Sequence, residues 1–460
     1  MNDMGLSGVL TSAARTLQAS YAALPTPREM AVLRADSKRA EDRGYYDPIE
    51  DERLRETYTA YLGMRVAIWQ AMQDLKPHFR RFDKNKALTS HELKAFGIAF
   101  SGAEIIVRTG EYLISLARER DIVWKKLDEA ELRYGLKRKS FTRIYRQLTS
   151  NFTMRNFYRA RDFYDANHKD ILETLKSDGL TTIADILTTL NLPTASRGDH
   201  LKRYRRFVNF SLRRRSIVAG RNTMFAVFEA AGSDIAELKI PLVKNIGAPK
   251  RVKPEVIDTL KPQLRPGDVF ITRHDDAMSN LFLPGFWPHG ALYIGEVEAR
   301  KSQNIAEVFD GVRRSEEEGI NMLEAKKDGV LLRDIEDTLQ VDAFVVLRPK
   351  LSQAQITQAI GKGLSHAGKL YDFIFDFSTS DRLVCTEVIY RAYHGVGPIN
   401  YTLSTQAGRK CLSAEDFLNQ AVAMDWFEPV IIYGIGGNDR FEDTTKVQRI
   451  LSQTFDSAFT

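Results

Sequence analysis

The chain has 460 residues, 43% of them hydrophobic and 27% charged, and its formal net charge is +6. That length is too great for a single hydrophobic core, so two or three domains are expected, and the composition is typical of a globular protein. The only cysteines, Cys385 and Cys411, exclude a disulfide framework and fit a reducing compartment.

Two features of the sequence bear on location. The N-terminus lacks a basic segment followed by a long apolar stretch, so no secretory signal is predicted. The most apolar later window, residues 96–107, contains Ser101, Gly102 and Glu104 and is too short to span a bilayer. A cytoplasmic location is therefore expected.

The charge is unevenly distributed along the chain. Residues 1–250 hold 43 Lys and Arg and 30 Asp and Glu, whereas the remaining 210 residues hold 23 and 30. The first part therefore carries a net charge of +13 and the second a net charge of −7. Such asymmetry indicates two units with different roles.

Residues 1–48 are weakly patterned, and Pro25, Pro27 and a turn at 44–48 interrupt them, so an irregular segment is predicted. Residues 49–245 show apolar positions at helical spacing, which predicts a helical domain whose role the sequence does not identify. A capping box, Thr89-Ser90-His91-Glu92, marks the start of its longest helix. The expected helices cover residues 51–78, 90–120, 121–134, 140–177 and 181–190.

One short motif in this domain raises the question of a metal. Asp83-Lys84-Asn85 resembles the start of a calcium-binding loop. Such a loop needs an oxygen ligand at its fifth position and a glycine at its sixth, where this chain has Ala87 and Leu88. No metal site and no cofactor are predicted.

The segment Lys202–Arg215 is the strongest basic patch, and Tyr204, Phe207 and Phe210 alternate with its charges. Nucleic acid, an anionic membrane surface and an acidic face of the second half are the candidate partners. A helix with a solvated basic face and the aromatics in the core is favoured, because aromatics three residues apart are ordinary helix packing. Nucleic acid is disfavoured since no nucleic-acid-binding signature accompanies the patch.

The pattern changes at the stretch 247–254, which is rich in Gly and Pro and predicts a linker, so the domain boundary is placed near 245–255. Beyond it, short strand-like runs alternate with turns and a helix near 352–366 follows them. This pattern predicts an α+β domain with a small, mostly antiparallel sheet. The expected strands are 269–272, 289–295, 304–311, 330–332 and 343–347.

Cys385 follows a polar run with turn and N-cap chemistry, and the apolar spacing after it is that of one helix face. We expect Cys385 at or near the first turn of a helix, where unpaired N–H groups and the helix dipole favour a thiolate. A lone cysteine is more often a buried packing residue. Other residues must therefore support a catalytic role.

His289 begins an apolar strand directly after Pro288, and Glu307 lies on the next expected strand. A histidine at the start of a strand is able to face a cleft, although a packed or surface histidine is the commoner case. Nucleophile, base and orienting acid are the three roles of cysteine catalysis. Cys385, His289 and Glu307 are candidates for them.

Four motifs occur in a defined order: Arg265-Pro266-Gly267-Asp268-Val269, Pro284 to Gly295, Tyr371 to Asp376, and Leu383-Val384-Cys385-Thr386-Glu387-Val388. As a set they resemble the circularly permuted branch of the NlpC-type, papain-like cysteine hydrolases, in which the histidine strand precedes the cysteine helix. The resemblance covers about residues 255–435. It leaves a C-terminal tail at 436–460 and says nothing about residues 1–245.

The resemblance implies Cys385 as nucleophile, His289 as general base and a polar third residue on the strand after the histidine strand. Glu307 fits that third position, and Asp310 is its rival. Tyr371 and Trp287 are implied to contact substrate. Glu387 has either a motif role or a structural one, as an ion pair or a helix cap. The resemblance also implies a capped helix beginning at Ser413-Ala414-Glu415 and a closing strand at 427–433.

The function expected from these residues is cleavage of an amide or peptide-type bond through an acyl-thioester on Cys385. Two alternatives stay open. One is a lipid acyl hydrolase or acyltransferase at a membrane surface, which the basic first half supports. The other is a non-enzymatic interaction protein with a degenerate papain-like domain, against which the retained cysteine and histidine argue. The sequence leaves the substrate and the oligomeric state open.

Overall fold

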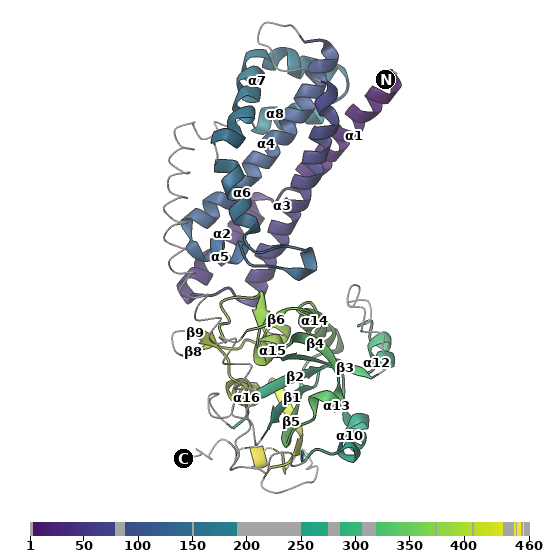
Figure 1. Cartoon of the computed structure of the whole chain (residues 1–460), viewed down its shortest axis with the longest axis vertical. Coiled ribbons are helices and arrows are strands. Elements are labelled where there is room, and N and C mark those ends of the chain that lie inside the picture. Colours follow the sequence, from purple (N-terminus) through teal and green to yellow (C-terminus); the bar gives the residue numbers. More distant parts are fainter. Residues whose placement is uncertain are drawn as a thin grey trace. The chain divides into compact units, whose positions relative to one another are not determined.

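The protein is represented by a computed structural model that describes residues 3–78, 88–149, 151–190, 250–274, 286–305, 319–372, 375–406, 409–435, 446–447, 449–451 and 454 (Figure 1). The described residues form two compact units, one ending at Leu190 and one from residue 250 onward that also includes Glu131–Arg133. The predicted boundary near 245–255 lies between the two and largely outside the described residues, so it stays a prediction. The basic segment Lys202–Arg215 and the calcium-like motif at 83–85 also lie outside them.

The described part of the first unit is helical, as predicted. Its α-helices are α1 (Asp3–Ala22), α2 (Pro27–Arg43), α3 (Pro48–Leu75), α4 (Ser90–Glu119), α5 (Asp121–Leu127), α6 (Ser140–Thr149), α7 (Asn151–Ser177) and α8 (Thr181–Leu190). The capping box that predicted the start of α4 is present, with the N–H of Glu92 donating to Thr89 Oγ1 and the Glu92 carboxylate accepting from the N–H of Thr89. No helix in the described residues is both long and apolar enough to cross a membrane.

Residues 1–48 differ from the expectation of an irregular segment, because α1 and α2 occupy most of them. Pro27 begins a helix instead of breaking one: it is the first residue of α2, where its missing N–H costs nothing. Thr26 caps that helix through a reciprocal pair of hydrogen bonds with Glu29. Gly44, with a φ of 85°, ends it in the left-handed conformation that favours glycine.

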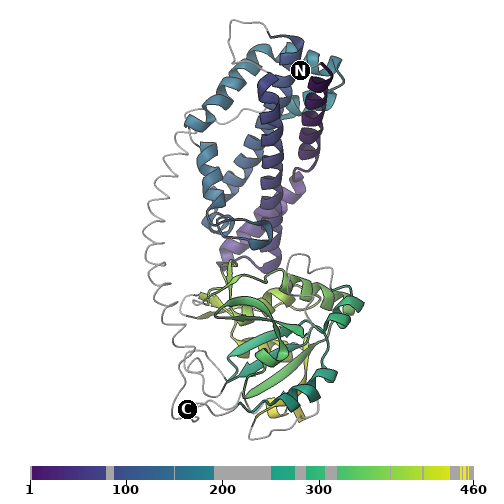
Figure 2. The same cartoon turned by 45° about the vertical axis from the view of Figure 1, so that its right-hand side comes forward.

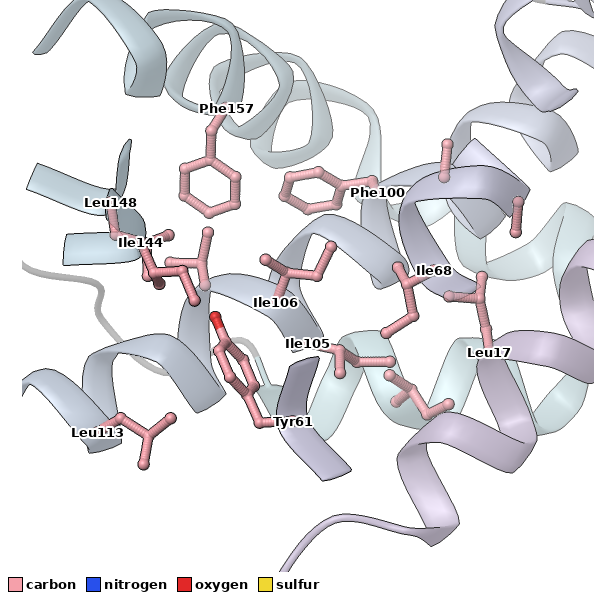
Figure 3. Packing of buried hydrophobic residues seen from close by; sticks show 14 of the residues in the cluster. Leu17, Tyr61, Ile68, Phe100, Ile105, Ile106, Leu113, Ile144, Leu148 and Phe157 are labelled. Atoms are coloured by element: carbon pink, nitrogen blue, oxygen red, sulfur yellow. The ribbon is translucent and has the colours of Figure 1, made fainter. Parts of the chain in front are cut away.

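The core of the first unit forms around α4, whose residues are buried over most of its length. Leu17 of α1, Ile68 of α3 and Ile105 of α4 are each 1% exposed or less, and Figure 3 shows how such side chains converge from several helices. Apolar burial of this extent is the main stabilising contribution to a helical bundle.

The second unit contains a six-stranded antiparallel sheet in the order β10-β5-β1-β2-β3-β4. Its strands are β1 (Val269–Arg273), β2 (His289–Tyr293), β3 (Ile320–Lys326), β4 (Gly329–Asp334), β5 (Ala343–Pro349) and β10 (Phe427–Tyr433). The predicted α+β class with a small antiparallel sheet is therefore confirmed. The predicted closing strand at 427–433 coincides with β10.

Helices cover both faces of this sheet (Figures 1 and 2). On one face, α14 (Gln353–Leu364) and α15 (Cys385–Tyr393) pack so closely that an ideal Cβ at Gly290 of β2 would lie 2.7 Å from Ile389 Cδ1. On the other face, α10 (Pro254–Leu260) and α13 (Ile335–Thr338) share a hydrophobic cluster with Phe270 and Phe344. This layering holds α15 directly against the strand that carries His289.

The remaining elements of the unit lie around this central layer. They are α12 (Val297–Ser302), α16 (Ala414–Ala423), the parallel pair β6 (Leu370–Tyr371) and β7 (Arg382–Leu383), and the hairpin β8 (Ser404–Gln406) and β9 (Arg409–Cys411). Ser413 caps α16 as predicted, by accepting from the N–H of Asp416.

Two features of the second unit differ from the sequence-based expectation. The strand that pairs with β2 on the side away from β1 is β3. The sequence did not predict this strand because Asn321 and Glu324 interrupt its apolar pattern. The expected strand at 304–311 falls largely outside the described residues. Part of the predicted tail packs into the domain, since Val447 and Leu451 are buried.

Gly290→Ala is expected to destabilise the second unit, because its new methyl group would lie 2.7 Å from Ile389 Cδ1 and 3.2 Å from Ile271 Cδ1. Overpacking of this kind costs about 1–3 kcal/mol. Calorimetry of the full chain measures the change. Ile389→Val removes the nearest atom, so the double variant should recover part of the loss, although Ile389→Val alone costs about 0.5–1.5 kcal/mol. Strict additivity of the two changes would contradict the close approach of α15 and β2.

Candidate active site

Cys385 is the first residue of α15, as predicted, and Val384 precedes it in an extended conformation. All nine residues of this helix are buried, and Cys385 itself is 3% exposed. A buried ion pair at i and i+4 holds the helix: Arg391 donates to Glu387 across 2.8 Å and also to the carbonyl of Thr379. Glu387 therefore has the structural role that the sequence left open for it.

His289 is the first residue of β2 and pairs with Thr272 of β1. Its side chain is 21% exposed, so the ring lies at the edge of the core rather than within it. The predicted position of this histidine, at the start of a strand and facing the cysteine, agrees with the structure. The two residues come from β2 and α15, which are nearly 100 residues apart in sequence and packed together in space.

The His289 imidazole and the backbone N–H groups of Gly290 and Thr386 are the groups near the Cys385 thiol that act on its pKa. Burial alone would raise the pKa of Cys385, but the charge and hydrogen bond of His289, together with the two N–H groups, bring it below its ordinary value. Burial alone would lower the pKa of His289, yet Cys385 and Glu324 raise it above its ordinary value. Both shifts favour a thiolate–imidazolium pair near neutral pH.

The carboxylate that meets His289 belongs to Glu324 of β3, with 2.7 Å between His289 Nε2 and Glu324 Oε1. Glu324 is 1% exposed. Burial would raise its pKa, but His289 and then Lys326 lower the pKa below the ordinary value for a glutamate. Glu307 and Asp310, the residues expected in this place, lie outside the described residues.

Sequence reasoning missed Glu324, although a signal for it exists in the strand register. Leu292 of β2 pairs with Leu323 of β3. Continuing that register places Glu324 opposite Ala291, two residues from His289 and so on the same face of the sheet. Finding it requires knowing that the strand beside β2 begins near residue 320.

The two residues expected to contact substrate have different environments. Tyr371 of β6 pairs with Leu383, two residues before Cys385, and the nearby charge of Cys385 adds to burial in raising the pKa of Tyr371. Trp287 is 0% exposed and its indole N–H donates to Thr454 Oγ1 across 3.2 Å. Tyr371 is therefore placed near Cys385, whereas Trp287 has the environment of a packing residue.

Residues 263–455 match the family model described as "Permuted papain-like amidase enzyme, YaeF/YiiX, C92 family". This similarity is confined to the second unit and does not extend to the helical first unit. The permuted, papain-like nature expected from the motif order is thereby confirmed, and the matched range extends beyond the predicted end at 435. No curated protein and no solved structure matches the chain.

Nothing in the described residues of the permuted papain-like domain suggests a metal centre, since no three His, Cys, Asp or Glu side chains there are placed to hold an ion together. The residues that the structure does bring together are a thiol, an imidazole and a carboxylate. Such a set transfers protons and forms covalent bonds to acyl groups.

In a Cys411→Ser variant, Cys385 is the single thiol, and its alkylation by iodoacetamide as a function of pH should show a midpoint below about 8.5, the ordinary thiol value. His289→Gln removes the imidazolium, so burial dominates and the midpoint should rise. The matched Cys385→Ser variant reports on Cys411, which is 8% exposed. If the less exposed Cys385 did not react faster at about pH 6, or did not respond to His289→Gln, the activated thiol would be disproved.

Proposed function

We propose that the permuted papain-like domain hydrolyses an amide bond through an acyl-thioester on Cys385, with His289 as general base. The observation that carries this proposal is the series Cys385–His289–Glu324, in which His289 lowers the pKa of Cys385 and lies 2.7 Å from the carboxylate of Glu324. The family description, which names an amidase, supports the amide over the lipid ester.

Glu324 is the orienting acid in this proposal. Its Oε1 accepts from Nε2 of His289, which leaves Nδ1 as the ring nitrogen that faces the sulfur. A fixed carboxylate stabilises the imidazolium and restricts rotation of the ring. Glu324 therefore replaces Glu307 and Asp310 as the proposed third residue.

In the first half-reaction, the Cys385 thiolate attacks the carbonyl carbon of the amide and a tetrahedral oxyanion forms. The oxyanion is stabilised by the backbone N–H of Cys385, which begins α15 and therefore has no partner within the helix. Collapse of the intermediate breaks the C–N bond, and His289 gives its proton to the departing amine. The products of this step are a thioester on Cys385 and a free amine.

In the second half-reaction, neutral His289 takes a proton from water and the resulting hydroxide attacks the thioester. Collapse of the second intermediate expels the thiolate, which again forms an ion pair with the imidazolium. A carboxylic acid is released and the resting state of the site returns. His289 thus alternates between acid and base.

The assembled side chains argue against a degenerate, non-enzymatic domain. An interaction module has no need for a thiol whose pKa is lowered by a neighbouring imidazole. A cysteine kept only for packing would be expected among apolar side chains, with its pKa raised by burial. Cys385 instead has polar groups nearby that lower its pKa, namely the His289 imidazole and the backbone N–H groups of Gly290 and Thr386.

Cys385→Ala should reduce hydrolysis of any amide that the wild type cleaves by at least about 10³-fold, because the covalent intermediate is lost. A library of peptide amides, screened with the wild type in parallel with carboxylic esters, supplies the substrate. Intact-mass measurement after acid quenching should show an acyl adduct on the wild type alone. An active Cys385→Ala variant, or esters as the sole substrates, would contradict the proposal.

Glu324→Gln should lower kcat/KM by roughly 10- to 100-fold, since the amide still accepts from Nε2–H but no longer stabilises the imidazolium. The midpoint of Cys385 alkylation should rise in the same variant. Glu428→Gln on β10 is a control, because Glu428 pairs with Arg348 in the ladder between β10 and β5, away from β2. Equal kinetics for Glu324→Gln and Glu428→Gln would remove Glu324 from the site.

A further inference from the structure

The second carboxylate oxygen of Glu324 has partners of its own. Oε2 accepts from Thr338 Oγ1 at 3.0 Å and lies 3.1 Å from Lys326 Nζ and 3.5 Å from Arg333 Nε. One oxygen of this buried carboxylate therefore faces His289, and the other faces a hydroxyl group and two cations. The role of Glu324 as orienting acid uses only the first oxygen, Oε1, and leaves the contacts of Oε2 unexplained.

The strand register explains why these cations meet Glu324. Residues 322, 324 and 326 of β3 lie on one face by alternation. Arg333 of β4 pairs with Met322, and Glu324 itself pairs with Leu331. Lys326 and Arg333 are therefore on the same face as Glu324, each two positions away along the ladder, and α13 contributes Thr338 from above that face.

We propose that Lys326 and Arg333 are positioning residues for the reaction at Cys385: they hold Glu324 as an oriented carboxylate and, through it, keep His289 protonated beside the thiolate. This inference rests on the proposed function and extends it. The site then extends from Cys385 on α15, through His289 on β2, to the β3–β4 hairpin.

The charge balance of the site supports this role. A thiolate, an imidazolium and a carboxylate together carry one excess negative charge, and Cys385 and Glu324 are at most 3% exposed. An unbalanced buried charge is costly, so it favours protonation of Glu324, and a protonated Glu324 would no longer stabilise the imidazolium. The two cations beside Glu324 balance the excess charge and keep the carboxylate ionised.

The cations themselves are held without full desolvation. Lys326 is 31% exposed and Arg333 is 13% exposed. Asp337 of α13 lies 3.3 Å from both, and Asp328 of the β3–β4 turn lies 2.5 Å from Arg333. Among the described residues, the charged groups that face Glu324 or its cations are thus His289, Lys326, Arg333, Asp328 and Asp337. Negative and positive charges therefore alternate from the Cys385 sulfur to the exposed aspartates.

The test uses the full chain carrying Cys411→Ser, so that alkylation reports on Cys385 alone. Lys326→Met and Arg333→Met remove one charge each and keep an apolar side chain of similar length. Each should raise the midpoint of the alkylation profile and slow the reaction about three- to tenfold at about pH 6, given that one unit of pKa is a tenfold change. Above the midpoint, where the thiolate is fully formed, the rates should equal that of the parent.

Lys327→Met is the matched control, since Lys327 is adjacent in the same hairpin and exposed; its profile should not move. Lys326→Arg should restore the parent profile because it keeps the charge. Unchanged profiles in Lys326→Met and Arg333→Met, or a rate loss of the same size at every pH, would overturn the proposal. A parent thiol with an ordinary midpoint would instead overturn the proposed function, so the two failures are distinguishable.

Discussion

The electrostatic interaction between Cys385 and His289 is the one on which the arrangement of the candidate site depends. Charges are expensive inside a protein unless hydrogen bonds and opposite charges surround them. Here the imidazole and two backbone N–H groups lower the pKa of the Cys385 thiol, while Glu324 Oε1 lies 2.7 Å from His289 Nε2. β2, β3 and α15 must keep their relative positions for those contacts to exist, so the central layer of the domain and the proposed chemistry impose the same requirement.

The sheet order gives each strand a distinct part in that arrangement. β2 lies inside the sheet, between β1 and β3, and its residue Gly290 allows α15 to approach. β3 brings a carboxylate, and β4 adds a cation to the same face. Cys385 is thus buried and His289 lies at the edge of the core, whereas Lys326 and Arg333 extend toward the edge of the sheet. Changes near the edge are able to adjust protonation without disturbing the core.

Local signals in the sequence predicted the features that depend on a few neighbouring residues, such as the starts of helices and strands. Polar residues before an apolar helical pattern located Cys385, the strand after Pro288 located His289, and the box at Thr89 located α4. Two errors came from signals with two meanings. Pro27 indicates a break by its residue type, yet proline is also favoured at the first position of a helix, where the structure places it. β3 was not predicted because Glu324 is polar and buried, and only its pairing with His289 explains its place in a strand.

The helix α15, which begins with Cys385, has no solvent-facing side, since all of its nine residues are buried. The sulfur therefore has little freedom to search for its substrate: the core that surrounds α15 has already restricted its motion during folding. Entropy that a flexible nucleophile would lose on reaching the transition state is lost here before any substrate arrives. In the proposed reaction, adaptation to different acyl groups must accordingly come from residues other than Cys385, whose sulfur stays fixed.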